Sequence, residues 1–317
     1  MRFFENANYD FMAVRRRIYV VVAVSLLVCV AAAITFEVTS GSWLKYGVDF
    51  TGGTLVQVRM NDASSVAELR SVIDAQVPGS EITAFGEESE YLVRVPRVEG
   101  ASAGETSAVI VDALRTHYGE DQFNIVRTEA VGAKVGDELQ TRAALAVLLS
   151  FAATLIYLAF RFEWRFGLAA VIATGHDIAL TLGLISILQL DVTLSTVAAV
   201  LTIVGYSLND TIIVFDRVRE NLVGMRRESF TSILNRSINE TLPRTVLTGS
   251  TTLATLFALL IFGSGELRDF AIIMIFGIAM GTYSSIFVAS PALLEIEQRW
   301  PGERVKARTR TRAGATA

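Results

Sequence analysis

The sequence has few of the residues that build covalent or metal-bound sites. Its 317 residues include one cysteine, Cys29, and two histidines, His117 and His176. One cysteine forms no disulfide within a chain, and two histidines so far apart lack the close spacing of a zinc motif. The P-loop pattern G-x-x-x-x-G-K-[ST] is also absent. We therefore expect no metal, no bound cofactor, no ATP site and no enzyme activity.

Charged residues are also scarce, and long apolar runs take their place. The chain is 19% charged and 52% hydrophobic, with a mean hydropathy of +0.46. Six apolar windows are long enough to cross a ~30 Å hydrocarbon core at ~1.5 Å per residue. We predict a multi-pass α-helical membrane protein with spanning helices over 18–36, 143–160, 166–190, 192–215, 244–262 and 270–294.

The basic residues predict the orientation of these helices. Eighteen of the 28 lysines and arginines lie in segments that must share one side of the membrane, whereas the two short loops opposite hold only Arg268. The positive-inside rule therefore predicts cytoplasmic termini. A cleaved signal peptide is the alternative for 18–36, but 19 uncharged residues exceed the usual h-region. The remaining boundaries are a cytoplasmic N-terminus over 1–17, an extracytoplasmic domain over 37–142, a cytoplasmic amphipathic loop over 216–243 and a basic cytoplasmic tail over 295–317.

The extracytoplasmic domain is acidic, with 16 acidic and 8 basic residues over 41–141, so we expect no nucleic-acid partner. Its hydrophobic periodicity alternates between period two and helical spacing. We predict strands over 55–60, 81–85, 91–95 and 123–131 and helices over 64–77 and 102–118. The order β-α-β-β-α-β predicts an inserted α+β domain of the ferredoxin-like type.

Two long motifs stand out at the ends of predicted elements. Residues 46–55 read Y-G-V-D-F-T-G-G-T-L, where Gly52 and Gly53 permit positive φ at a hinge. Asp49 in this motif is a candidate for pairing with a partner subunit. Residues 205–221 read G-Y-S-L-N-D-T-I-I-V-F-D-R-V-R-E-N.

Carboxylates within the predicted membrane helices are candidate proton carriers. Asp177 lies 12 residues after Arg165, about 18 Å into the membrane, and is preceded by His176. Asp210 lies on the next helix, where Asn209, Ser207 and Tyr206 place more polar atoms in the same turn. An ionised, unpaired carboxylate at such depth costs several kcal/mol, so it is usually buried in the bundle and often functional. The alternative for either acid is a neutral side chain that holds helices together.

The cytoplasmic side offers two further predictions. Arg244 follows Pro243, which suits a first helical turn, and could approach Asp210 if its helix starts deep in the membrane. The loop over 216–243 is basic and places apolar residues on one helical face. We expect it to lie along the membrane surface, near anionic lipids or a partner, with a solvated linker as the alternative.

The motifs and their order resemble the SecF family, the smaller membrane subunits of SecDF protein-export complexes, which are related to RND transporters. Supporting matches are His176-Asp177 and the segment 242–248. The resemblance implies a proton-motive-force-driven role in translocating unfolded polypeptide across the bacterial inner membrane, with SecD and the SecYEG translocon as partners. The candidate proton relay comprises Asp210, Arg244, Asp177 and His176, and the matching motif residues are Gly47, Asp49, Phe50, Gly52, Gly53, Asn209, Asp216 and Arg217. The alternatives are one half of a proton-coupled exporter of small molecules or lipids, and a structural scaffold.

Overall fold

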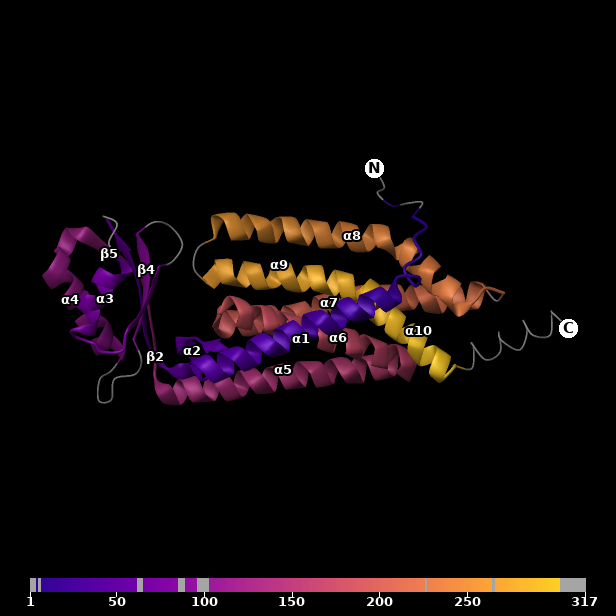
Figure 1. The fold of residues 1–317 in the computed structure, drawn as a ribbon, viewed down its shortest axis with the longest axis horizontal. Coiled ribbons are helices and arrows are strands. Elements are labelled where there is room, and N and C mark those ends of the chain that lie inside the picture. Colours follow the sequence, from indigo (N-terminus) through magenta and orange to yellow (C-terminus); the bar gives the residue numbers. More distant parts are fainter. Residues whose placement is uncertain are drawn as a thin grey trace.

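The computed structural model describes residue 4 and residues 7–61, 65–84, 89–95, 103–225, 227–263 and 266–302. A bundle of long helices carries a small sheet domain at one end (Figure 1). Among the described residues, six helical runs are long and apolar enough to cross a membrane. They are α1 (Arg15–Ser40), α5 (Ala133–Arg161), α6 (Trp164–Leu188), α7 (Leu194–Gly224), α8 (Phe230–Phe262) and the run Glu266–Arg299.

The helices formed by residues 216–243 differ from the sequence-based expectation. The segment 216–243 is almost wholly helical, because α7 continues to Gly224 and α8 begins at Phe230. Ser229 caps α8 by accepting a hydrogen bond from the Ser232 amide at 3.2 Å. Pro243 therefore lies inside α8 and not in its first turn.

The apolar face of residues 216–243 was expected to lie along the membrane surface, but it packs inside the bundle. Ile233, Leu234 and Ile238 are fully buried in the core of the bundle, so they are not available to a membrane surface. The segment before α1 packs on the same part of α8. The Tyr9 amide donates to Asn239 Oδ1 at 2.9 Å, and Asn239 Nδ2 donates back to the Tyr9 carbonyl at 2.9 Å. These contacts explain why α8 extends so far beyond the apolar window.

The last membrane run is one helix with an irregular segment. It comprises α9 (Glu266–Ser284), a five-residue π-helix, η2 (Ser285–Ala289), and α10 (Ser290–Arg299). Pro291 has no amide to donate, and Ser290 Oγ donates to the Ser285 carbonyl at 2.9 Å. A proline and a competing hydroxyl are common causes of a local change in helix pitch.

The sheet domain contains four strands and two helices. The strand order is β3-β4-β2-β5, all neighbours are antiparallel, and α3 and α4 cover the face turned away from the bundle (Figure 1). Its core includes Val56, Leu69, Ile73, Ile110 and Leu114, none of which is exposed. The bounds are β2 (Gly53–Met60), α3 (Val66–Asp74), β3 (Glu81–Ala84), β4 (Glu90–Val95), α4 (Ala103–Tyr118), η1 (Glu120–Gln122) and β5 (Phe123–Val131).

Two connections join this domain to the bundle. On one side β5 runs through Gly132 directly into α5. On the other, the chain leaves α1 and forms β1 (Lys45–Tyr46) and the single-turn helix α2 (Val48–Thr51) before entering β2. The strand β1 pairs in parallel with β6 (Asp191–Val192), which precedes α7. The domain is thus attached at the ends of α5 and α7.

Parts of the sequence-based predictions lie outside the described residues. They are the first residues of the N-terminus, the first residue of the predicted helix 64–77, the last residue of the predicted strand 81–85, the first residue of the predicted helix 102–118 and the tail from residue 303 onward.

Candidate functional site

The segment 47–53 forms a tight turn that requires its glycines. Gly52 and Gly53 have φ of 70° and 123°, in the region that favours glycine. The positive φ predicted for this pair is present. A Cβ on Gly47 would lie 2.9 Å from Thr193 Cγ2 and 3.1 Å from the Val192 carbonyl oxygen, so glycine also permits the close approach to the start of α7.

This segment is fixed to the N-terminus of α7 by polar contacts. Asp49 Oδ2 accepts a hydrogen bond from the Leu194 amide at 2.9 Å, which places a negative charge at the positive end of the helix dipole. The Gly47 amide donates to the Val192 carbonyl at 2.8 Å. Phe50 is buried, and its ring meets that of Tyr46 edge to face. Asp49, which we considered as a contact to a partner subunit, is therefore already engaged within this chain.

Charged side chains line the space between the sheet and the bundle. Arg94 pairs with Asp191, and Lys45 pairs with Asp191 at 3.5 Å and with Glu81 at 3.0 Å. Burial opposes the effect, but the hydrogen bonds and charges of Lys45 and Arg94 lower the pKa of Glu81 below its ordinary value. These ion pairs hold the domain against the helix ends.

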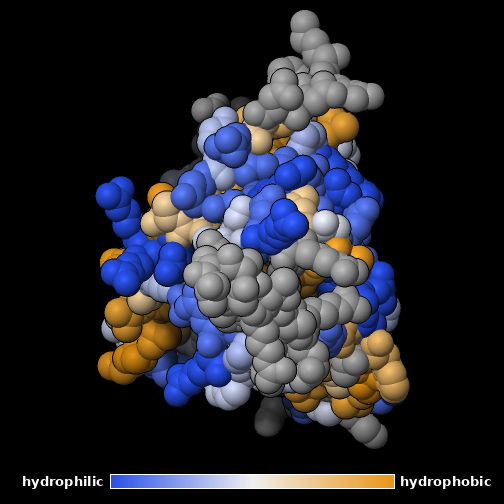
Figure 2. Space-filling view, turned by 90° about the vertical axis from the view of Figure 1, so that its right-hand side faces the viewer, coloured by the Kyte–Doolittle hydropathy of each residue, from blue (hydrophilic) through white to orange (hydrophobic). Residues whose placement is uncertain are grey.

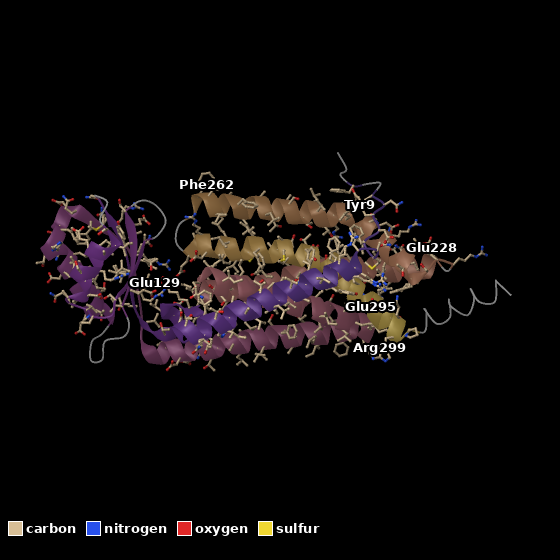
Figure 3. All side chains as sticks on the ribbon, viewed as in Figure 1. Tyr9, Glu129, Glu228, Phe262, Glu295 and Arg299 are labelled. Carbon is tan, nitrogen blue, oxygen red and sulfur yellow. The ribbon has the colours of Figure 1, made fainter. Side chains whose placement is uncertain are left out.

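A second group of charges lies at the edge strand β5. Arg127 pairs with Glu129 and, at 3.5 Å, with Glu266 of α9. Glu129 faces the bundle (Figure 3). Burial raises the pKa of Glu129, and the charges of Glu266 and Asp49 raise it further while Arg127 opposes them. Acidic groups are therefore crowded here.

Inside the bundle, Asp177 is enclosed by hydrogen-bond donors. Its side chain is 1% exposed. Ser207 Oγ and Ser284 Oγ each donate to Oδ2 at 2.5 Å, and His176 Nδ1 lies 2.9 Å from Oδ1. Asp177, which we predicted together with His176, is thus bonded to Ser207 of α7 and Ser284 of α9 as well.

Asp210 is equally buried but has fewer contacts. It is 1% exposed, and its only hydrogen bond among the described residues comes from Thr282 Oγ1 at 3.5 Å, the limit of such an interaction. Arg244 lies near enough to act on Asp210 through its charge, although no salt bridge joins them in the described part of the chain. The predicted pairing of Arg244 with Asp210 is therefore not seen as an ion pair between the described residues and stays a prediction.

The two acids share their supporting helices. Ser207 and Asp210 are one turn apart on α7, and Thr282 and Ser284 lie close together on α9. We expected Ser207 to assist Asp210, but it bonds to Asp177 instead. The sequence indicated neither Thr282 nor Ser284 as a member of the site.

Glycines on α9 make the close contact between these helices possible. A Cβ on Gly277 would lie 2.2 Å from Ile203 Cδ1, and a Cβ on Gly281 would lie 3.0 Å from Ser207 Cβ. The pattern Gly277-x-x-x-Gly281 predicts such packing from sequence alone. It was the one signal that could have led to Ser284, which lies one turn further along α9.

One face of the bundle presents small and polar side chains at membrane depth. On α7 these are Thr202, Gly205 and Asn209, all exposed in this chain. On α8, Arg244 and Thr251 are exposed in the same way. Asn209 therefore points away from Asp210, contrary to our expectation that it adds polar atoms to that site. Polar groups facing hydrocarbon are costly, so this face is suited to contact with protein.

The motif residues Asp216 and Arg217, at the end of α7 away from the sheet domain, form ion pairs. Asp216 accepts from Arg161 at 2.8 Å, and Arg217 donates to Glu220 at 2.7 Å and to Glu240 of α8 at 2.6 Å. Figure 2 views this end of the molecule, where hydrophilic surface predominates. In the part of the chain that the structure describes, no group of three or more histidine, cysteine or acidic residues is arranged to hold a metal ion.

Comparison with known sequences identifies related proteins. The profile described as "Protein export membrane protein SecD/SecF, C-terminal" matches residues 110–299, and the "SecD/SecF GG Motif" profile matches residues 40–63. Protein translocase subunit SecF of Gemmatimonas aurantiaca is 48% identical, with 95% of this chain and 91% of the relative covered. SecF of Magnetococcus marinus is 42% identical, with 98% and 97% covered.

Two solved structures are also similar. The crystal structure of SecDF, a translocon-associated membrane protein from Thermus thermophilus, matches with a TM-score of 0.82 at 37% identity, covering 94% of this chain. The crystal structure of SecDF in the super-membrane-facing form matches with a TM-score of 0.65 at 35% identity, covering 98%. This chain spans 40% of the length of each of those solved chains.

Proposed function

The chain belongs to the SecD/SecF family of protein export membrane proteins, and we propose that it is a SecF-type subunit that uses the proton motive force to assist Sec-dependent translocation of unfolded polypeptide. The observation that carries the proton-coupling part is the state of Asp210. It is a buried carboxylate within a membrane-spanning helix, held by one long hydrogen bond and close to an arginine. Such intramembrane acids commonly mark ion pathways.

The energy available from one proton sets what this site can do. A charge that crosses 100 mV releases about 2.3 kcal/mol. That amount is enough to shift the balance between two arrangements of modestly different energy. Arg244 lies on α8 and Asp210 on α7, so a change in the spacing of these helices would change how strongly the arginine stabilises the charged acid. We assign Asp210 the role of proton carrier and Arg244 the control of its charge.

The attachment of the exposed domain supports coupling to polypeptide movement. The segment that holds this domain is bound to the N-terminus of α7, the helix that carries Asp210. We infer that the domain is ferredoxin-like, which the strand order β3-β4-β2-β5 and the two helices on one face support. A change at Asp210 that moves α7 would therefore also move the domain that contacts the unfolded chain.

A partner with further membrane helices completes the proposed site. The small and polar face formed by Thr202, Gly205, Asn209 and Arg244 is exposed in this chain. Coupling sites of transporters commonly lie between two related repeats, and six spanning helices supply one. We propose SecD as the second half and the SecYEG translocon as the site of action.

We further propose a bacterial inner-membrane location with both termini in the cytoplasm, and this topology has a direct test. After Cys29 is replaced, single cysteines at Ser89 in the sheet domain and at Ser229 before α8 are treated with a membrane-impermeant thiol reagent on cells whose outer barrier has been opened. We expect labelling at Ser89 only. Labelling at Ser229 in unbroken membranes would reverse the assignment.

The function itself is tested by reconstitution. The chain, its SecD partner and the translocon are placed in vesicles with a translocating preprotein, and a proton gradient is applied. We expect faster translocation than without the chain, and loss of the gain when an ionophore collapses the gradient. A gain that survives the ionophore would refute proton coupling. Extrusion of small lipophilic dyes without any effect on the preprotein would favour an exporter instead.

A further inference from the structure

The corner where α1 and α6 begin and α10 ends carries two half-exposed indole rings. Trp164 is 52% exposed and Trp300 is 50% exposed, and their ring centroids lie 6.1 Å apart. Arg165 fixes both residues, because its guanidinium carbon lies 5.1 Å from the centroid of the Trp164 ring and its Nε donates to the Trp300 carbonyl at 2.6 Å. The chain therefore holds both tryptophans in place while about half of each stays accessible.

Three arginines of the same corner are exposed and form no ion pair with the described residues. Arg16 and Arg17 lie in the first turn of α1, and Arg299 is the last residue of α10 (Figure 3). Their neighbour Arg15 instead pairs with Glu295 at 3.4 Å, which joins the first turn of α1 to α10 one turn before Arg299. We call the following five residues the basic corner: Arg16, Arg17, Arg299, Trp164 and Trp300.

Neighbouring arginines, by contrast, have acidic partners. Arg165 pairs with Glu163 at 3.0 Å, and Arg161 pairs with Asp216 at 2.8 Å. The three arginines of the basic corner lack such partners in the described part of the chain, and the sequence that follows, 303–312, adds five basic residues and one acid. Unbalanced positive charge is therefore concentrated at this corner, where it attracts anions.

The basic corner lies at the depth of lipid headgroups. All three arginines lie within five residues of a window predicted to cross the membrane, and the farthest, Arg299, follows the window 270–294 by about 8 Å along a helix. Trp164 lies two residues before the window 166–190. The headgroup layer extends about 5–8 Å beyond the hydrocarbon core on each side, and tryptophan is enriched there. The arginines are thus level with lipid phosphates.

Apolar surface begins directly next to these charges. On α1, Val20, Val21 and Val24 follow Arg17 within two turns and are 62%, 55% and 53% exposed. No residue of α1, all of which the structure describes, is buried in this chain. A free phosphate or the acidic surface of a soluble protein would match the charges only. A phospholipid matches the charges and the apolar surface, because its phosphate is joined to acyl chains.

We propose that the basic corner binds the headgroups of anionic phospholipids. The guanidinium groups of Arg16, Arg17 and Arg299 donate to phosphate oxygens, and arginine suits this contact because its planar fork of N–H groups matches phosphate geometry. The indoles of Trp164 and Trp300 lie against the glycerol region, which suits a ring with one polar edge. A zwitterionic lipid carries its own cation beside the phosphate, so it is attracted less. This site is independent of the proposed proton coupling.

The test measures lipid selectivity through the tryptophans of the full chain. The sequence contains three tryptophans, so Trp43→Phe leaves only Trp164 and Trp300 as indole fluorophores. The chain is reconstituted in vesicles that contain phosphatidylglycerol or phosphatidylcholine brominated near the glycerol, since bromine quenches indole fluorescence on contact. We expect phosphatidylglycerol to quench more strongly at equal mole fraction, and high salt to reduce the difference. Equal quenching by the two lipids would overturn the proposal.

Single variants locate the charges. Each arginine near an anionic surface contributes ~1 kcal/mol, so Arg16→Gln, Arg17→Gln and Arg299→Gln should each weaken the relative binding of phosphatidylglycerol about fivefold. Unchanged quenching by phosphatidylcholine would show that each variant is inserted normally.

Arg227→Gln is the matched control for these variants. Arg227 is also exposed and forms no ion pair with the described residues. It follows α7, which extends nine residues, about 14 Å, past the window 192–215, so it lies beyond the headgroup layer. This variant should leave the selectivity unchanged. A loss equal to that of Arg299→Gln would show that only the net charge of the chain matters and would refute the site.

The last measurement uses the complex of this chain with its partner subunit, purified from native membranes. Lipids extracted from the complex should contain phosphatidylglycerol beyond its share in the membrane. The variant that combines the three arginine substitutions should lose this enrichment, with co-purification of the partner as the control for assembly. No enrichment in the unchanged complex would mean that protein covers the basic corner, and the proposal would then be wrong.

Discussion

The surroundings of Asp177 and Asp210 differ although both acids are 1% exposed. Asp177 accepts two serine hydroxyls at 2.5 Å and contacts His176, whereas Asp210 has one threonine contact at 3.5 Å. A carboxylate with a complete set of donors loses some of those hydrogen bonds when it takes up a proton. A carboxylate with few donors takes up a proton without losing hydrogen bonds. The difference teaches that burial alone does not identify a proton carrier, and that the poorly bonded acid is the better candidate.

The largest expected effect concerns Asp210, the acid with few hydrogen-bond donors. Asp210→Asn keeps the size of the side chain and removes its titration, so we expect proton-dependent export to be abolished. Assembly with the partner should remain intact. The measurement is preprotein translocation into vesicles with and without a gradient, with co-purification of the partner as the control. Full gradient-driven export in this variant would move the proton carrier role to Asp177.

The next test addresses Asp177, the acid with several hydrogen-bond partners. Asp177→Asn replaces one accepting oxygen with an NH2 donor, so either the two serine hydroxyls or a proton on His176 Nδ1 would lose their acceptor. We expect a loss of about 1–3 kcal/mol in the free energy of unfolding. Unfolding of the detergent-solubilised chain would measure it, and Asp210→Asn should cost less in the same assay. An equal loss in both variants would contradict the difference between the two sites.

A comparable effect tests the packing of α7 against α9 that holds Ser207 on Asp177. Gly281→Ala would place a Cβ 3.0 Å from Ser207 Cβ, which presses α7 and α9 apart and displaces Ser207 from Asp177. We expect about 1–3 kcal/mol of destabilisation from this overpacking. Gly175→Ala, whose added Cβ would meet nothing within 4 Å, is the matched control and should be neutral. Similar stabilities of the two variants would show that the contact of α7 with α9 is loose.

The smallest effect lies outside the membrane, where water screens charges. The pKa of Glu129 is raised by burial and by Glu266 and Asp49, so its charged form is disfavoured in the folded protein. The folded state then binds a proton more readily than the unfolded state, and stability falls as the pH rises through this raised pKa. Glu129→Gln should reduce that fall by less than about 1 kcal/mol. The measurement is the free energy of unfolding of the solubilised chain from mildly acidic to neutral pH. The same pH dependence in Glu129→Gln and the unchanged chain would show that Glu129 does not contribute to it.

Sequence reasoning was most successful where local rules dominate. Hydropathy located six membrane runs, glycine chemistry predicted the turn at Gly52 and Gly53, and the spacing of Gly277 and Gly281 predicted close packing. It also selected the pair His176 and Asp177, which the structure brings into contact. Each of these features depends on residues close together in the chain.

The errors arose where distant parts of the chain meet. The helix predicted at the start of α8 was placed along the membrane surface, but its apolar face is buried by the bundle, a contact that periodicity does not distinguish from a membrane surface. Ser207 was attributed to Asp210 because they are neighbours on one helix, yet it points toward α6. Ser284 and Thr282 gave no sequence signal, since serine and threonine are common on membrane helices.

The unequal stiffness of α7 and α8 has a mechanical consequence. The helix α7 runs for 31 residues without a proline, about 46 Å, from the Asp49 contact past Asp210 to the end away from the sheet domain. It therefore behaves as a straight rod that carries displacement from end to end. The helix α8 contains Pro243 directly before Arg244, and a proline is where a helix bends most readily. A bend of α8 at Pro243 would therefore displace Arg244 relative to Asp210, whereas a straight α7 would carry a displacement of Asp210 to the contact with the sheet domain.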